Sequence, residues 1–589
     1  MSRHSHAQHA VLLGLGLLIT AAGAWVALRP RPGPVVPDID ATVEAVNSEA
    51  NVPVEIPFTA RQPHADPFDR VTLDVAFTDP LGVTRTVPAF WAGGDTWKVR
   101  YASGVVGDHH WQSACNVTAD AGLHGVAGRV RVSPYSGTNP LFRHGPVRVA
   151  ADRRHFEYAD GTPFFWLGDT WWMGLCHRLH YPDEVRQLAA DRQAKGFNVV
   201  QIVAGLYPDM PPFDPRGANE AGFPWEADYA RIRPAYFDAA DARLRTLVDH
   251  GLTPCLVGAW GYFLPMMGED KMKAHWRYLV ARYAAWPVVW CAAGEANLPY
   301  YLAKNFPSDD RSVVPGWTAV LRHIRATDPF RRPLTIHPTA INRHTARHVT
   351  ADPALLDFDL LQTPHGGREA VPVAVRAVRE SFAAAPTLPV VNGEASYERL
   401  NDTLPTEATR SMFWVCLMNG AAGHTYGANG IWQVNRRGRP HGPSPNGTGN
   451  GYGVITWDDA MRLPGSEQMG IGKRFFESLP WTRLTPLPDA VVWADGPPAR
   501  ENPLFAPQAC GLGDELRAVY VPAARPIIVH QLTPRAAYRV TYFDPVTGNR
   551  SPPAPVAAGP DGRWRCDAPA HGHDWVVLIE AGRVSGPIP

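Results

Sequence analysis

Two glutamates stand at the ends of apolar segments that are typical of buried strands. Glu295 follows the run VVWCAAG at 288–294, and Glu394 follows the run PVVNG at 389–393. A carboxylate is costly in an apolar interior unless an ion pair stabilises it or a reaction uses it. An ion pair explains either glutamate taken alone, but two glutamates that end separate strands favour a shared chemical role.

A pair of carboxyl groups has the chemistry to cleave a glycosidic bond. A protonated carboxyl releases the leaving oxygen while an ionised carboxyl attacks the anomeric carbon, and in retaining enzymes the two groups stand about 5–5.5 Å apart. Burial or a neighbouring negative charge would raise the pKa of the acid. The sequence contains no HExxH, GxSxG or CxxC motif, so we expect no metal centre, no serine hydrolase site and no cofactor.

The segments around the two glutamates predict a (β/α)8 barrel. Apolar strand-like runs alternate with amphipathic stretches such as 182–196 and 236–251, as in a parallel sheet covered by helices. Eight such units favour a closed TIM-type barrel. The alternative is a doubly wound open sheet, which needs a glycine-rich phosphate turn where this sequence has LGDTWW. The expected strands are 164–170, 197–204, 253–260, 288–295, 334–338, 358–364, 389–394 and 422–427.

The chain of 589 residues is long enough for two to four domains. Short alternating runs broken by turns predict β-sandwiches before and after the barrel. We therefore expect a multidomain protein in which two β-sandwich domains flank a central (β/α)8 TIM barrel. The expected regions are 1–49 (signal peptide or membrane anchor with a Pro-rich linker), 50–150 (N-terminal Ig-like sandwich), 151–484 (catalytic barrel) and 485–589 (C-terminal sandwich).

Residues 10–28 form an uncharged apolar stretch of 19 residues after a polar start. Two interpretations remain open. As a signal peptide, the stretch would be cleaved near the small residues 22–24. As a membrane anchor, it is just long enough to cross a bilayer. Either interpretation exports the rest of the chain to the periplasm or the cell exterior.

The overall charge excludes some partners. Lys and Arg number 56, as do Asp and Glu, so the net charge is zero. Nothing in this balance favours nucleic acid as a partner. The seven cysteines are an odd number that leaves at least one thiol free. The sequence leaves the oligomeric state open.

Polar and aromatic residues at the strand ends are candidates for binding a substrate, because the functional groups of a TIM barrel lie there. Asp169 can accept hydrogen bonds from hydroxyls or cap the next helix. Of the adjacent Trp171 and Trp172, one can stack on a sugar while the other belongs to the core. The histidines can bind hydroxyls, hold the second glutamate or bond to the backbone. The candidates are Asp169, Trp171, Trp172, Gln201, His337, Gln362, His365, His424, Tyr426 and Trp432.

Four longer motifs carry a family resemblance. Residues 156–172 (FEYADGTPFFWLGDTWW), 195–201 (KGFNVVQ), 390–398 (VVNGEASYE) and 420–433 (GAAGHTYGANGIWQ) resemble the apiosidase-like glycoside hydrolases, within the superfamily of TIM-barrel retaining glycosidases. The resemblance covers about residues 50–580. It implies a small β-sandwich before the barrel. It also implies a second sandwich after the barrel, often labelled collagen-binding, that ends near a DWV segment such as 574–576.

The resemblance also implies roles for the two glutamates. Glu295 corresponds to the acid/base and Glu394 to the nucleophile of a retaining hydrolase that acts on an oligosaccharide or polysaccharide. Many relatives carry Asn directly before the acid/base, where it contacts the sugar 2-hydroxyl, whereas this chain has Gly294 there and Asn297 two residues after the glutamate. The residue that makes this contact therefore stays open. The alternative function is a non-catalytic carbohydrate-binding protein on a glycosidase-like barrel.

Overall fold

The computed structural model describes residues 45–299, 311–340, 344–443, 452–497 and 502–582. The expected signal or anchor segment lies outside these ranges, as does most of the linker behind it. A search of the described residues for a helix long and apolar enough to cross a bilayer finds none.

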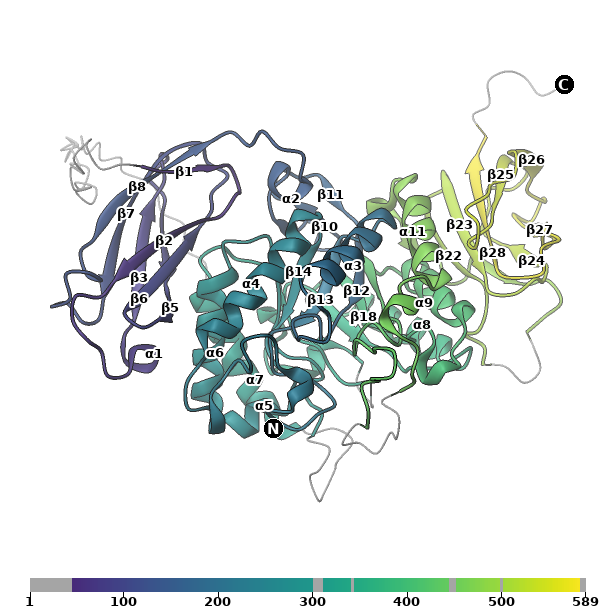
Figure 1. Cartoon of the computed structure of the whole chain (residues 1–589). Helices are drawn as coiled ribbons and strands as arrows, with labels where there is room; N and C mark the ends of the chain where they lie inside the picture. Colours follow the sequence, from purple (N-terminus) through teal and green to yellow (C-terminus); the bar gives the residue numbers. More distant parts are fainter. Residues whose placement is uncertain (1–44, 300–310, 341–343, 444–451, 498–501, 583–589) are drawn as a thin grey trace, which may run out of the picture. The chain divides into compact units, whose positions relative to one another are not determined.

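The centre of the chain is an eight-stranded parallel barrel, so the predicted fold class is confirmed (Figure 1). The sheet order is β16-β15-β14-β13-β12-β19-β18-β17, in which neighbouring strands follow one another around the barrel. At the seam between the two end strands, the backbone N–H of Asp357 donates to Leu334 O at 2.9 Å. The strands are β12 Trp166–Thr170, β13 Val199–Val203, β14 Thr253–Val257, β15 Val289–Cys291, β16 Leu334–Thr335, β17 Asp359–Gln362, β18 Val390–Glu394 and β19 Gly423–Tyr426.

Helices follow most of these strands and cover the outside of the barrel, as α3, α4 and α6 show in Figure 1. Every residue of the eight barrel strands is buried, because the helices cover the sheet on the outside and side chains fill the barrel on the inside. Between β16 and β17 the described residues contain only the short 3-10 turns Ala346–Val349 and Pro353–Leu355 in place of an α-helix. The helices are α3 Asp183–Ala194, α4 Pro234–Asp249, α5 Phe263–Met267, α6 Glu269–Tyr283, α7 Val314–Thr327, α8 Val371–Ala383, α9 Thr406–Met418, α10 Trp457–Ala460 and α11 Pro464–Glu477.

A small three-stranded sheet lies at the start of the barrel. It pairs β9 Val147–Val149, β10 Phe156–Tyr158 and β11 Pro163–Phe164. Phe156 packs on Trp166 and Phe358, with ring centroids 5.3 Å from each. These aromatic contacts fill the amino-terminal end of the barrel, so the polar strand ends are gathered at the opposite, carboxyl-terminal end.

The region before the barrel forms two facing sheets around a common apolar core, antiparallel except for one parallel pair between residues 46–49 and 130–133. That core contains Val75, Phe77, Val99 and Val130, all fully buried. Arg100 attaches this sandwich to the barrel by donating to Arg282 O of α6 at 2.8 Å. One sheet has the order β1-β8-β7-β3-β4 and the other β2-β6-β5, with α1 Pro67–Arg70 and α2 Pro140–Arg143 beside them. The strands are β1 Val46–Glu49, β2 Val54–Thr59, β3 Leu73–Thr78, β4 Thr84–Pro88, β5 Phe90–Gly93, β6 Thr96–Tyr101, β7 Gly107–Cys115 and β8 Ala127–Ser133.

The region after the barrel forms a second pair of sheets with a separate core, which contains Val519, Ile527, Val529 and Trp575. Arg410 of α9 joins this sandwich to the barrel through Asp574, with Nε 2.9 Å from Oδ2. The sheet orders are β20-β22-β23-β28-β25-β26 and β21-β24-β27. The strands are β20 Thr485–Pro486, β21 Val491–Trp493, β22 Gln508–Leu512, β23 Leu516–Val521, β24 Ile527–Val529, β25 Ala537–Phe543, β26 Ala554–Ala557, β27 Trp564–Cys566 and β28 Trp575–Ala581.

All seven cysteines are described, and all are buried and free. The odd count predicted at least one free thiol, and the fold leaves every thiol unpaired. They behave as small apolar core residues.

Candidate active site

Glu295 lies in the turn after β15 rather than within the strand, which ends at Cys291. Its φ of 40° falls in the left-handed region, which is uncommon for a residue with a side chain. Two neighbouring backbone bonds hold this conformation, from Gly261 N to Gly294 O at 2.7 Å and from Ala296 N to His337 O at 2.8 Å. Such local strain is concentrated at functional sites, where it fixes the direction of a side chain.

Two side chains hold the carboxyl group of Glu295. Gln362 Nε2 donates to Oε1 at 2.9 Å, and Trp260 Nε1 donates to Oε2 at 3.2 Å. Burial and the negative charge of Glu394 raise the pKa of Glu295 well above the usual glutamate value, and these two hydrogen bonds offset only part of the shift. Glu295 therefore keeps its proton near neutral pH, as a general acid requires.

Glu394 is the last residue of β18, and a β-bulge directs it. The pairing between β17 and β18 shifts after Leu361, so that Gln362 lies opposite Glu394 and Gly393 is the extra residue. A Cβ at Gly393 would come within 2.4 Å of a methyl group of Leu360, so only glycine fits this position. The bulge brings Gln362, which holds Glu295, beside the strand that carries Glu394.

Two histidines face the carboxylate of Glu394. His365 Nε2 lies 2.9 Å from Oε1, and His337 Nε2 lies 3.2 Å from Oε2. The backbone N–H of Glu295 donates to His337 Nδ1 at 3.4 Å, so Nδ1 is the acceptor and the proton is on Nε2, the ring nitrogen close to Glu394. Burial opposes the charge of Glu394, but the two histidines outweigh it and lower the pKa of Glu394 below the usual value. Glu394 is therefore ionised, as a nucleophile requires.

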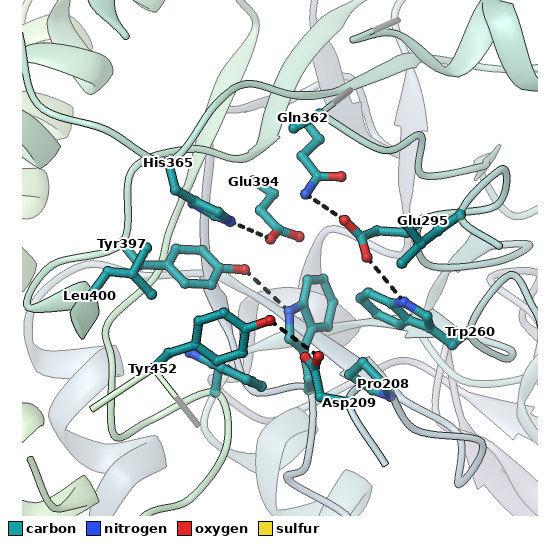
Figure 2. A pocket seen from close by; sticks show the side chains of 14 residues that line it. Pro208, Asp209, Trp260, Glu295, Gln362, His365, Glu394, Tyr397, Leu400 and Tyr452 are labelled. Carbon is teal, nitrogen blue, oxygen red and sulfur yellow. Dashed lines mark hydrogen bonds and ion pairs between the residues drawn. The ribbon is translucent and has the colours of Figure 1, made fainter. Parts of the chain in front are cut away.

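The two glutamates line one pocket of about 290 Å³ at the carboxyl-terminal end of the barrel (Figure 2). Aromatic rings form much of its wall, and Trp172 Nε1 donates to the hydroxyl of Tyr397 at 3.2 Å. Burial, together with the charge of Glu394, raises the pKa of Tyr397, which keeps the phenol neutral. The described lining is Trp172, Pro208, Asp209, Trp260, Glu295, Leu298, Ala340, Gln362, His365, Glu394, Tyr397, Leu400, Trp432 and Tyr452.

Some residues expected at the site line the pocket, and others are buried elsewhere. Trp172, Gln362, His365 and Trp432 line the pocket, and His337 touches it through Glu394. The other candidates are buried and are not among the lining residues of the pocket: Asp169, Trp171, Gln201, His424 and Tyr426.

The buried candidates have structural partners. Asp169 is fully buried, with Oδ2 2.6 Å from both Arg192 Nε and Trp171 Nε1. Gln201 Nε2 donates to Gly393 O at 2.9 Å, which supports the bulge before Glu394. The hydroxyl of Tyr426 donates to Glu398 Oε2 at 2.5 Å. Of these three side chains, only Gln201 points into the barrel. Asp169 and Tyr426 point outward, where the guanidinium of Arg192 on α3 binds Asp169 and lies over the ring of Tyr426.

His424 is the last of the buried candidates. His424 is fully buried between the sheet and α9, against the ring of Phe413, and burial lowers its pKa to about 3, so its ring is neutral. Within the described ranges, no group of three or more His, Cys, Asp or Glu side chains is arranged to hold a metal ion.

Four polar or aromatic lining residues were not expected from the sequence as site residues: Asp209, Trp260, Tyr397 and Tyr452. Trp260 follows β14 and was visible as a strand-end residue. Tyr397 comes three residues after Glu394 and was part of the quoted motif 390–398. Asp209 and Tyr452 belong to long loops, where spacing gives no signal of spatial position.

Comparison with known proteins identifies the family. Residues 150–483 match the family described as "Apiosidase-like, catalytic domain". The chain belongs to this family of glycosidases. Residues 50–116 match a family described as a domain of unknown function, DUF5060. None of the curated proteins matches the chain.

Solved structures share the fold at low sequence identity. A glycoside hydrolase family 5 protein from Bacteroides vulgatus is 21% identical, with a TM-score of 0.62 over 77% of this chain and 96% of that chain. A second glycoside hydrolase from the same organism is 19% identical, with a TM-score of 0.61 over 91% of this chain and 100% of that chain. At these identities the likeness concerns the fold alone. The family and the paired carboxyl groups together support a glycosidase.

Proposed function

We propose that this glycosidase hydrolyses an oligosaccharide or polysaccharide with retention, with Glu394 as nucleophile and Glu295 as acid/base. The observation that carries the proposal is the opposite direction of two pKa shifts in one pocket, raised for Glu295 and lowered for Glu394. A retaining glycosidase needs one protonated and one ionised carboxyl group at the same time.

In the first step, a carboxylate oxygen of Glu394 bonds to the anomeric carbon while the bond to the leaving oxygen breaks. Glu295 gives its proton to that oxygen, which leaves as an alcohol. In the second step, the ionised Glu295 takes a proton from water, whose oxygen bonds to the anomeric carbon and releases Glu394. Glu295 ends the cycle protonated again, so atoms and charges balance.

The proposal also concerns the compartment in which the enzyme meets its substrate. The apolar stretch at 10–28 supports export of the barrel to the periplasm or the cell exterior, either free or anchored. The aromatic walls formed by Trp172, Trp260 and Trp432 suit the apolar face of a sugar ring.

The test is hydrolysis by the full chain of a panel of nitrophenyl glycosides and of plant and bacterial polysaccharides. The anomeric proton of the first product, observed by NMR before mutarotation, is expected to have the configuration of the substrate. An inverted first product would refute the assignment of a nucleophile.

Two variants complete the test. Glu394→Gln, which keeps the shape of the side chain, is expected to abolish turnover, and Glu369→Gln, an exposed glutamate outside the pocket, is expected to leave it unchanged. Wild-type protein that binds glycans without turnover would instead support the carbohydrate-binding alternative.

A further inference from the structure

A third carboxylate lines the same pocket. Asp209 lies in the long loop after β13, is only 8% exposed, and accepts a hydrogen bond at Oδ1 from the Tyr452 hydroxyl at 3.2 Å. Its φ of 57° is in the left-handed region, which Asp and Asn tolerate better than other side chains. In Figure 2 its carboxylate points toward the space between Glu295, Glu394 and Tyr452.

Two other polar side chains of the lining, Gln362 and His365, are hydrogen-bonded to the two glutamates. The amide nitrogen of Gln362 donates to Glu295, and the ring nitrogens of His365 contact Glu394 and Ala395 O. Gly294 contributes no side chain, and a Cβ there would lie 2.3 Å from the ring of Trp260. Because Trp260 fills that space, no side chain at position 294 can reach a sugar. A carboxylate accepts several hydrogen bonds at once, so the bond from Tyr452 is compatible with further hydroxyl partners on Asp209.

The charges of the lining residues also bear on which sugars the pocket can bind. Three carboxyl groups line it, from Asp209, Glu295 and Glu394, and its described lining includes neither Lys nor Arg. Sites that recognise a carboxylate or phosphate of the substrate rely on Arg or Lys, whereas like charges in a confined site repel.

We propose that Asp209 binds ring hydroxyls of an uncharged sugar at the cleavage site and disfavours sugars that carry a carboxylate. This inference rests on the proposed function of the pocket. Asp209 is thereby a specificity-determining residue, placed by its loop and by Tyr452 rather than by a barrel strand.

Asp209 also acts on the acid electrostatically. Its negative charge adds to burial and to the charge of Glu394 in raising the pKa of Glu295. The other groups that face Glu295 are Gln362 and Trp260, which donate hydrogen bonds to it. Removal of the charge on Asp209 should therefore lower the pKa of Glu295 and move the alkaline limit of activity to lower pH.

The experiment uses the full chain and pairs of nitrophenyl glycosides that differ only at carbon 6, such as glucoside with glucuronide and galactoside with galacturonide, together with pentosides. Wild-type protein is compared with Asp209→Asn, which keeps shape and left-handed backbone but loses the charge. The matched control is Asp228→Asn, an exposed aspartate with φ of 55° in the segment between β13 and α4.

The proposal expects turnover of a neutral member in preference to its acidic counterpart. Asp209→Asn should raise KM for the neutral substrate about tenfold or more, since charge-assisted hydrogen bonds to hydroxyls are lost. It should also shift the alkaline limb of kcat/KM to lower pH, while Asp228→Asn changes neither quantity. Preferred cleavage of the acidic member would overturn the proposal, as would an Asp209→Asn variant with unchanged KM and alkaline limb.

If no glycoside is cleaved, the proposed function fails. Binding measurements then test separately which sugars the pocket prefers. Glu295→Gln protein would be titrated calorimetrically with neutral and with acidic oligosaccharide fractions. Binding of neutral sugars that Asp209→Asn weakens supports the proposal. Binding confined to acidic sugars, or no binding of either class, refutes it.

Discussion

Replacement of Glu295 by Ala should affect substrates according to how much their leaving group needs a proton. General acid catalysis contributes about 10²- to 10⁴-fold, which corresponds to about 2.7–5.5 kcal/mol in the activation barrier. Under the proposed mechanism, the loss for poor leaving groups should lie in the upper part of this range, because burial and the charge of Glu394 raise the pKa of Glu295. A dinitrophenolate leaves without protonation, so its release should be nearly unaffected.

The pH dependence of activity in Glu295→Ala provides a second test of the role of Glu295. As the proposed acid, Glu295 acts only while protonated, so wild-type activity should fall as pH rises through its raised pKa. Glu295→Ala should lose this alkaline limb. The acid limb belongs to Glu394 and should remain, because a neutral Glu295 contributes no charge to Glu394 in that range.

The assay is kcat/KM over pH for a phenyl and a dinitrophenyl glycoside of the sugar identified in the panel. Glu380→Ala, a change of an exposed glutamate on α8, serves as the control. An equal loss for both leaving groups, or an alkaline limb that persists in Glu295→Ala, would show that Glu295 is not the acid.

Three further outcomes are expected. His365→Ala should raise the lowered pKa of Glu394 and move the acid limb of kcat/KM to higher pH, since activity is lost as pH falls through that pKa; an unmoved acid limb would contradict this. Asp169→Asn leaves the buried guanidinium of Arg192 without this ion-pair partner and should lower the free energy of unfolding by about 3 kcal/mol, measured by urea denaturation; an unchanged unfolding midpoint would argue against a structural role. A thiol reagent should titrate seven cysteines in denaturant and none promptly in the native protein, and rapid native labelling would show that a thiol is accessible.

The sequence determined the fold through local patterns that need no tertiary context. Apolar runs such as 197–204 and 389–394 predicted barrel strands, because a strand covered by helices on the outside and by core side chains inside is apolar on both faces. The predicted ends of the strands were less accurate. The run 288–295 predicted strand through Glu295, whereas β15 stops at Cys291 and the turn that aims Glu295 follows. Hydrophobicity does not distinguish a buried turn from a buried strand.

The sequence also singled out the two carboxyl groups of the site, since Glu295 and Glu394 each end an apolar run. It did not determine their charge states. Those depend on Glu394 as a neighbour of Glu295 and on His337 and His365 as neighbours of Glu394, and these contacts join residues far apart in the chain.

Only the tertiary structure decided which strand-end residues reach the pocket. Asp169 and Tyr426 end their strands but point outward to Arg192 of α3, because successive side chains of a strand point to opposite faces of the sheet. Asp209 and Tyr452 come together from loops more than two hundred residues apart. The packing of the whole barrel brings these two loops together. Loop contacts and electrostatic interactions depend on distances in space, whereas the alternation that predicts strands depends only on spacing along the chain.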